Sequence, residues 1–160
     1  MRAEYINPFV TSLKSTFRTM LECDAHRTEL SVKKDNRARY DVSGVIGLTG
    51  KAVGTVVLTL SEQVALKAAS TMLANEATTI DEEVLDAVGE LTNMVAGGAK
   101  SQLEELQMSA SLPSVITGRD HEIHFPSDVT PLSIAFDTKW GPLAIEVALV
   151  SEEERAASRR

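Results

Sequence analysis

The sequence predicts an α/β domain of the α+β type, in which helices pack on one largely antiparallel sheet. Three segments place apolar residues at helical spacing, within residues 7–21, 61–75 and 79–108. Runs rich in Val, Ile, Thr and Leu precede and follow the last two segments, and short turn sequences join neighbouring runs. This order favours a single layered domain over residues 1–150. The charged tail over residues 151–160 is expected to be flexible.

The first two helices are predicted from their start signals. Asn7 is the expected N-cap of the first helix, with Pro8 at its first helical position. Ser61 is the expected N-cap of the second helix, which we expect to end near Asn75. Both helices carry an apolar face and should therefore pack against the sheet.

The third helix is the longest periodic segment. Thr79 or Asp81 is its expected N-cap, and its periodicity continues to about Met108. The strands are expected at residues 30–32, 41–49, 52–60, 114–119, 131–138 and 143–150. Gly50-Lys51 reads as the turn of one hairpin, and residues 139–142 as the turn of another.

The third helix carries an unusual pair of polar residues on its outward face. Glu90 and Asn93 are three residues apart, so their side chains are neighbours on the helix surface. At about 100° per residue, they lie almost opposite a narrow apolar stripe. That stripe consists of Val84, Val88, Leu91 and Val95. We therefore expect Glu90 and Asn93 to point away from the core.

Small residues surround this polar pair. Asp86 and Gly97 fall in the same sector, and Gly89 and Ala96 lie along one edge of it. Glycine within a helix costs about 1 kcal/mol relative to alanine. One explanation is a partner that approaches this face closely, with Asp86, Gly89, Ala96 and Gly97 at the contact. The other is close packing of the glycines inside the monomer, with the polar pair solvated.

Composition excludes several classes of protein. Sixteen basic and 23 acidic residues give a net charge of −7, which disfavours binding to nucleic acid or to an anionic membrane. No segment is long and apolar enough to span a bilayer, and the polar start of the chain predicts no secretory leader. The single cysteine, Cys23, fits a reducing cytoplasm and reads as a buried structural thiol.

The other sequence patterns favour no site. His121 and His124 lie in a β-like context, where residues three apart point to opposite faces, so surface positions are favoured over metal ligation. The glycines between Gly44 and Gly54 do not have the spacing of a phosphate-binding loop, because Val45 and Ala52 stand where that motif needs Gly and Ser or Thr.

Residues 89–97 resemble the signature helix of the CheC/CheX/FliY chemotaxis phosphatases, whose active motif is Glu-x-x-Asn. The similarity covers roughly residues 5–150, and its order and spacing resemble the CheX branch. One copy of the motif is present, as in that branch. The other similar segments are Asn7-Pro8-Phe9, residues 45–50, residues 114–120, and residues 136–138 with Gly141.

The resemblance implies a phosphatase that acts on the aspartyl phosphate of a CheY-type response regulator. Asn93 would orient the attacking water, and Glu90 would pair with the regulator's lysine. The partner regulator would supply the Mg²⁺, so we expect no metal site in this chain. The resemblance also implies a cytoplasmic homodimer. Two alternatives stay open: a non-catalytic module that binds a regulator or a flagellar-switch component, and a helix-on-sheet dimer without phosphoryl chemistry.

Overall fold

The helices and strands follow the predicted order. The structure, a computed structural model, describes residues 3–126 and 129–158. Its helices are α1 (Ile6–Leu21), α2 (Glu62–Leu73), α3 (Glu82–Gln102) and α4 (Glu152–Ser158), with 3-10 turns η1 (Ala3–Tyr5) and η2 (Glu104–Leu106). Its strands are β1 (His26–Val32), β2 (Val42–Thr49), β3 (Ala52–Leu60), β4 (Ser109–Ala110), β5 (Ser114–Thr117), β6 (Leu132–Thr138) and β7 (Gly141–Ser151).

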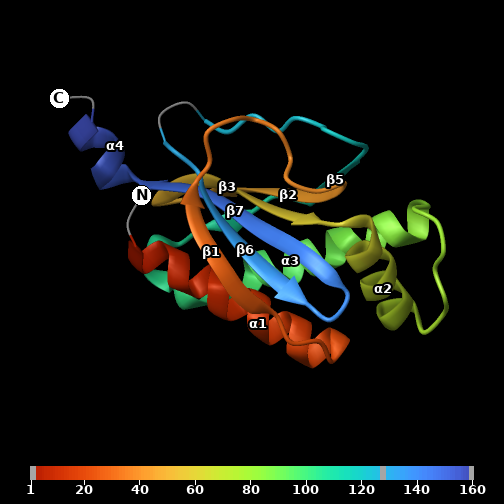
Figure 1. Ribbon diagram of the computed structural model, residues 1–160. Helices are drawn as coiled ribbons and strands as arrows, with labels where there is room; N and C mark the ends of the chain where they lie inside the picture. The colour runs from red at the N-terminus through yellow and green to blue at the C-terminus, as the bar shows by residue number, and fades with distance from the viewer. Residues whose placement is uncertain (1–2, 127–128, 159–160) are drawn as a thin grey trace.

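The strands form one seven-stranded antiparallel sheet. Its order is β1-β6-β7-β3-β2-β4, and β5 also pairs with β2. Helices α1, α2 and α3 cover one face of the sheet (Figure 1). Side chains from this face and from the helices form the main core, which includes Phe9, Phe17, Ile46, Leu91, Ile134 and Leu143. The predicted fold class, helices on a largely antiparallel sheet, is therefore confirmed.

Two irregular segments lie over the opposite face of the sheet. Residues 33–41 and 118–126 run across it and pair with each other (Figure 1). The Ala38 amide donates to the His121 carbonyl at 2.8 Å, and the Ile123 amide donates to the Asn36 carbonyl at 2.8 Å. These segments bury polar side chains on the sheet beneath them, including Ser43, Thr59, Ser133 and Glu146.

An ion pair is buried on that opposite face. Lys33 Nζ lies 2.8 Å from Glu146 Oε2, and the two side chains are 7% and 1% exposed. Burial raises the pKa of Glu146, and the hydrogen bond from Lys33 offsets part of this rise. The ion pair joins the first residue of the 33–41 segment to the central strand β7.

The helix starts agree with the predictions at two of three positions. Ser61 Oγ accepts from the Val64 amide, so the predicted N-cap of α2 is confirmed. Asp81 Oδ1 accepts from the Val84 amide at 3.0 Å, so Asp81, and not the alternative Thr79, is the N-cap of α3. The prediction for α1 was wrong. This helix begins at Ile6, directly after the η1 turn, so Asn7 lies inside it rather than at its N-cap.

The helix ends differ more from the predictions. Helix α2 ends at Leu73, because Ala74 after it is left-handed. Helix α3 ends at Gln102, because Leu103 leaves the helical conformation and leads into the η2 turn. The tail forms the short helix α4, none of whose described residues is buried. Strand β1 is longer than expected, since it begins at His26.

Candidate functional site

Helix α3 presents Glu90 and Asn93 to solvent. The four residues of the predicted apolar stripe are at most 1% exposed and belong to the core. Glu90 and Asn93 are both exposed on the opposite side of the helix. The orientation predicted from helical periodicity is therefore confirmed, and the two side chains lie one turn apart on an anchored helix.

The middle of α3 rests directly on strand β2. Thr92, which lies between Glu90 and Asn93 in the sequence, is fully buried. Its hydroxyl donates to the Val88 carbonyl at 2.7 Å. It packs on Gly44 so closely that a β-carbon on Gly44 would overlap Thr92 Oγ1. The glycine thus fixes the height of the helix above the sheet at the position of the polar pair.

A second close approach fixes one flank of α3. Gly98 faces α1, where a β-carbon would overlap Ser12 Oγ. The Ser12 hydroxyl donates to the Val95 carbonyl at 2.7 Å, so a buried side chain of α1 bonds the backbone of α3. This contact holds the two helices at one separation.

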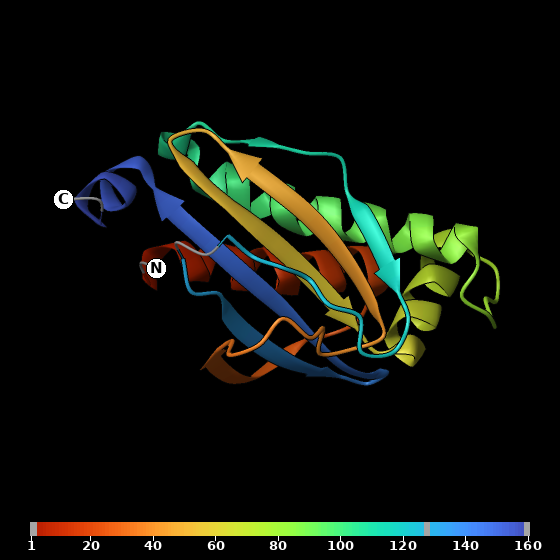
Figure 2. The ribbon, with the colours of Figure 1, turned by 90° about the horizontal axis from the view of Figure 1, so that it is seen from above.

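The other flank of α3 is covered by the chain that returns along it. Residues 107–117 run beside α3 before and within β5 (Figure 2). A β-carbon on Gly89 would lie 3.4 Å from Val115 Cγ2 and 3.6 Å from Pro113 Cγ. Gly89 is consequently buried by its own chain, and the open face of α3 is narrower than its periodicity alone suggests.

The four residues predicted at the partner contact separate into two groups. Asp86 is exposed, and Gly97 is half-buried, with no atom within 4 Å of the position that a β-carbon would take, so both border the open face. Gly89 and Ala96 are buried within the chain. Close internal packing, one of the two explanations considered for the small residues, therefore accounts for Gly89 and for Gly98.

Glu90 and Asn93 are unengaged within the described part of the chain. Neither side chain forms a hydrogen bond or an ion pair with residues 3–126 or 129–158. A carboxylate offers only acceptors, whereas a carboxamide offers both an acceptor and donors. Together the pair can bind a cation through Glu90 and hold a water molecule or a phosphoryl oxygen through Asn93.

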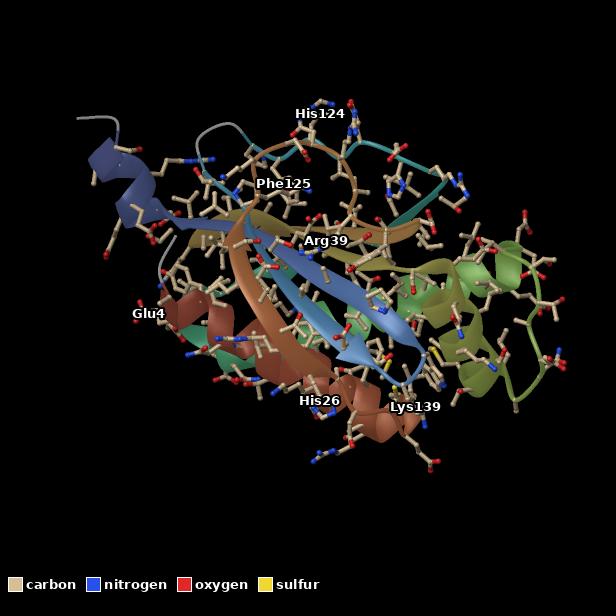
Figure 3. The ribbon with its side chains drawn as sticks, viewed as in Figure 1. Glu4, His26, Arg39, His124, Phe125 and Lys139 are labelled. Atoms are coloured by element: carbon tan, nitrogen blue, oxygen red, sulfur yellow. The ribbon has the colours of Figure 1, made fainter. Side chains whose placement is uncertain are left out.

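The histidines do not form a site. Figure 3 shows His26 and His124 on opposite sides of the molecule. His121 is engaged on both ring nitrogens, by the Gly118 carbonyl and by Ser43 Oγ, each at 2.7 Å. His124 is exposed and lies 3.8 Å from Glu122. Among the described residues, no three His, Cys, Asp or Glu side chains are grouped so as to hold a metal ion.

Cys23 is buried, as predicted. Its exposure is 1%, and burial raises the pKa of its thiol, which keeps the sulfur protonated and poorly nucleophilic.

The helices in the described part of the chain were compared with what a bilayer span requires. None of them combines the length and the apolar character needed to cross a membrane.

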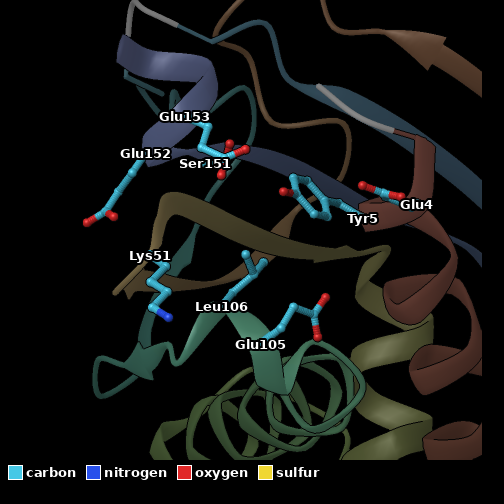
Figure 4. A pocket seen from close by; sticks show the side chains of 8 residues that line it. All are labelled: Glu4, Tyr5, Lys51, Glu105, Leu106, Ser151, Glu152 and Glu153. Atoms are coloured by element: carbon cyan, nitrogen blue, oxygen red, sulfur yellow. The ribbon is translucent and has the colours of Figure 1, made fainter. Parts of the chain in front are cut away.

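A separate pocket lies at the other end of α3. It has a volume of about 360 Å³ and is lined by η1, η2, the turn at Lys51 and the start of α4 (Figure 4). Four glutamates, Glu4, Glu105, Glu152 and Glu153, border it. The pocket begins beyond the last residue of α3, about 18 Å from Glu90 at 1.5 Å per residue. It is therefore distinct from the Glu90/Asn93 surface.

The fold and the outward Glu-x-x-Asn helix together define a CheC-like protein. A structure of a CheC-like superfamily protein from Shewanella sp. PV-4 is 37% identical, with 94% of this chain and 100% of that chain covered and a TM-score of 0.86. The family model for chemotaxis phosphatase CheX matches residues 42–137. The chain belongs to the CheX family.

Relatives within this family carry informative names. A protein of Thermotoga maritima named CheY-P phosphatase CheX is 32% identical over 126 residues, which cover 77% of this chain and 81% of that protein. The CheX of Borrelia burgdorferi, solved in a complex with CheY, BeF₃ and Mg²⁺, has a TM-score of 0.77 over 92% of this chain and 99% of that chain. At 23% identity, the latter shows a shared fold.

Sequence reasoning found the polar pair but missed its supports. The contact of Thr92 with Gly44 and the cover of Gly89 by Pro113 join segments far apart in sequence, and neither has a local signal. The buried ion pair of Lys33 and Glu146 did have a local sequence signal. Glu146 is the single charged residue in the apolar run of residues 143–150, which is typical of a charge that is paired in the interior.

Proposed function

We propose that this protein is a phosphatase that hydrolyses the aspartyl phosphate of a CheY-type response regulator. The observation that carries this proposal is the exposed, unengaged pair Glu90 and Asn93 on a rigidly seated helix. Membership of the CheX family supports it, as does the name of the Thermotoga maritima relative, CheY-P phosphatase. An acyl phosphate is already activated, so its hydrolysis depends mainly on the positioning of water.

Asn93 is proposed to orient the attacking water. Its side-chain oxygen accepts a hydrogen bond from the water, so that an oxygen lone pair points at phosphorus opposite the leaving carboxylate. The new P–O bond forms as the bond between phosphorus and the aspartyl oxygen breaks. The products are the free aspartate carboxylate, inorganic phosphate and the proton released from water. A neutral amide suits this role, because it does not repel the phosphoryl oxygens as a carboxylate would.

Glu90 is proposed to fix the approach of α3 by pairing with a lysine of the regulator. The ion pair would form as both groups leave water, and it would fix the orientation of the two proteins relative to each other. The Mg²⁺ that neutralises charge on the phosphoryl group is proposed to be held by the regulator. Asp86 and Gly97 are proposed to border the contact, while Gly89 and Ala96 would act through the packing that seats the helix.

Phosphate release from a phosphorylated regulator tests the proposal. Substoichiometric wild-type protein is expected to accelerate the release over many turnovers, whereas a non-catalytic module would protect or sequester the regulator. Asn93→Ala should abolish the acceleration with little effect on folding, because the side chain is exposed. Ser101→Ala, an exposed position on the same helix, is the matched control. Equal rates for wild type and Asn93→Ala would remove Asn93 from the mechanism.

A homodimer in the cytoplasm completes the proposal. Strand β1 is an edge of the sheet, and it leaves Leu30 and Val32 47% and 51% exposed on its helix-facing side. Pairing of β1 with its copy would extend the sheet and cover both side chains. Sedimentation of wild type and Val32→Glu tests this. A dimer that Val32→Glu converts to monomer is expected, and a monomeric wild type would contradict the dimer.

A further inference from the structure

An apolar side chain stands almost fully in solvent beside the candidate site. Leu112 is 89% exposed, whereas the other exposed large apolar side chains in the described part of the chain are 40–51% exposed. Single exposed apolar residues are common on protein surfaces, so exposure alone carries no functional meaning. The backbone that holds Leu112 and the position of that backbone relative to α3 are what distinguish it.

The backbone around Leu112 is fixed on both sides. The preceding residue, Ser111, donates its amide to the Gly47 carbonyl and accepts from the Gly47 amide through Oγ, both at 2.9 Å. The Ser111 hydroxyl also lies 3.0 Å from the Leu112 carbonyl oxygen. The following residue, Pro113, restricts Leu112 to extended backbone conformations. Leu112 is thus held outward by a rigid connector rather than by a mobile loop.

This connector runs along the flank of α3 that borders the Glu90/Asn93 face. It joins β4, which pairs with the end of β2, to β5, which pairs with its start, so it is antiparallel to the helix (Figure 2). Pro113 contacts Gly89, the residue directly before Glu90 and one turn before Asn93. Because Leu112 comes just before Pro113 on an antiparallel course, its backbone lies beside the turn of α3 that carries Asn93.

We propose that Leu112 is an apolar anchor for the receiver domain of the response regulator. The inference rests on the proposed function and names a second contact for the same partner. When Glu90 and Asn93 enter the regulator's phosphorylation site, a partner wide enough to cover them also covers the adjacent connector. A rigidly presented leucine loses little conformational entropy on burial and gains from leaving water.

The surrounding charge favours a regulator over a second copy of this chain. Asp86 and Glu90 are exposed on the same face of α3 and lie one turn apart. A two-fold contact through this face would bring these carboxylates toward their own copies. A receiver domain that offers a lysine to Glu90 would instead meet them with opposite charge. Leu112 therefore contributes affinity to a contact whose polar part is already complementary.

Two measurements test the anchor. In phosphate release from a panel of phosphorylated CheY-type regulators, Leu112→Ala should raise KM about tenfold and leave kcat unchanged, since anchors contribute to binding rather than to chemistry. Leu112→Met, which keeps a large apolar side chain at this position, should retain the wild-type KM. Leu73→Ala, at an exposed leucine on α2, is the matched control and should resemble wild type. A wild-type KM for Leu112→Ala would overturn the proposal.

Direct binding separates this proposal from the proposed activity. The same regulators, loaded with Mg²⁺ and beryllofluoride, are titrated with each variant. A tenfold loss of affinity in Leu112→Ala supports the anchor even if wild type releases no phosphate, a result that would overturn only the proposed activity. Equal affinities overturn the anchor, as does the absence of any binding by wild type. A change in the sedimentation of Leu112→Ala would assign the leucine to self-association and would also overturn it.

Discussion

Thr92 on helix α3 occupies the space that a side chain on Gly44 of strand β2 would need. Its hydroxyl bonds the Val88 carbonyl at 2.7 Å, and its side chain is fully buried against the bare backbone of the glycine. Glu90 and Asn93 lie on either side of Thr92 in sequence and point the opposite way. The contact on the inner face of the helix therefore sets the position of the polar pair on its outer face.

Gly44→Ala should displace α3 from the sheet. The new methyl group would overlap Thr92 and cost about 1–3 kcal/mol of unfolding free energy, as overpacked cores do. Phosphatase activity should fall as well, because Asn93 would lose its alignment. Urea unfolding and phosphate release measure the two effects. The control is Gly47→Ala on the same strand, where the nearest atom lies 3.8 Å away. Equal stability of both variants would contradict the role of Gly44.

Two adjacent glycines of α3 should respond oppositely to alanine. At Gly97 no atom lies within 4 Å of the added carbon, so Gly97→Ala should stabilise the protein by about 0.5–1 kcal/mol through helix propensity. At Gly98 the added carbon would overlap Ser12, so Gly98→Ala should destabilise it by about 1–3 kcal/mol. Thermal unfolding of the two variants checks the signs. Similar shifts in Tm would show that α1 adapts to the larger residue.

Glu90→Gln should weaken the binding of a beryllofluoride-loaded regulator by at least tenfold, since a desolvated charge pair is lost. The wild-type affinity should fall with increasing salt more steeply than that of the variant. Titration at several ionic strengths measures both quantities. Glu83→Gln removes an exposed acid from the first turn of the same helix and serves as the control. If both variants bind alike, Glu90 contributes only to the overall charge.

The buried Glu146 should make stability depend on pH. Its pKa in the folded protein is raised above the ordinary 4.5, so the folded state binds this proton more tightly than the unfolded state. The resulting stabilisation is complete below pH 4.5 and is lost as pH rises through the raised pKa. Relative to a Lys33→Met, Glu146→Gln double variant, wild type should therefore lose stability across this window. Urea unfolding from about pH 4 to about pH 7 measures the difference, and a gain would contradict the raised pKa.

The single substitution Glu146→Gln should be more harmful than the double one. It leaves the Lys33 ammonium, 7% exposed, with the Arg37 carbonyl as an acceptor but without its carboxylate, and a buried charge that loses its charged partner carries a penalty. In the double variant neither charge remains, so much of that penalty should disappear. A double-mutant cycle in urea gives the coupling between the two positions. Additive effects would show that water reaches Lys33 once its partner is removed.

The fold was predictable from sequence where local chemistry determined it. Ser61 and Asp81 bind the amides expected of N-caps, and the strand around residues 52–60 was predicted with its observed bounds. The start of α1 was not predictable from Asn7 and Pro8, because the η1 turn leads directly into the helix. The outward direction of Glu90 and Asn93 followed from helical periodicity alone, since the opposite stripe is uniformly apolar.

The surroundings of the candidate site could not be predicted in this way. Periodicity placed Gly89 at the edge of the exposed face, but it cannot show that Pro113, twenty-four positions later, returns to cover that edge. The same limit applies to Gly44 and Thr92, which are neighbours only because α3 crosses β2. Contacts between distant segments depend on how the layers stack, and a single sequence contains no local signal for them.

The strand order has a consequence for any pair of molecules joined at β1. Helix α3 packs on β2, which lies next to the short strands β4 and β5, toward the opposite end of the sheet from β1. Two copies paired along β1 would form one continuous sheet and would therefore carry their Glu90 side chains far from the dimer interface, toward opposite ends of that sheet. Two regulators could then be served at once, without competing for room.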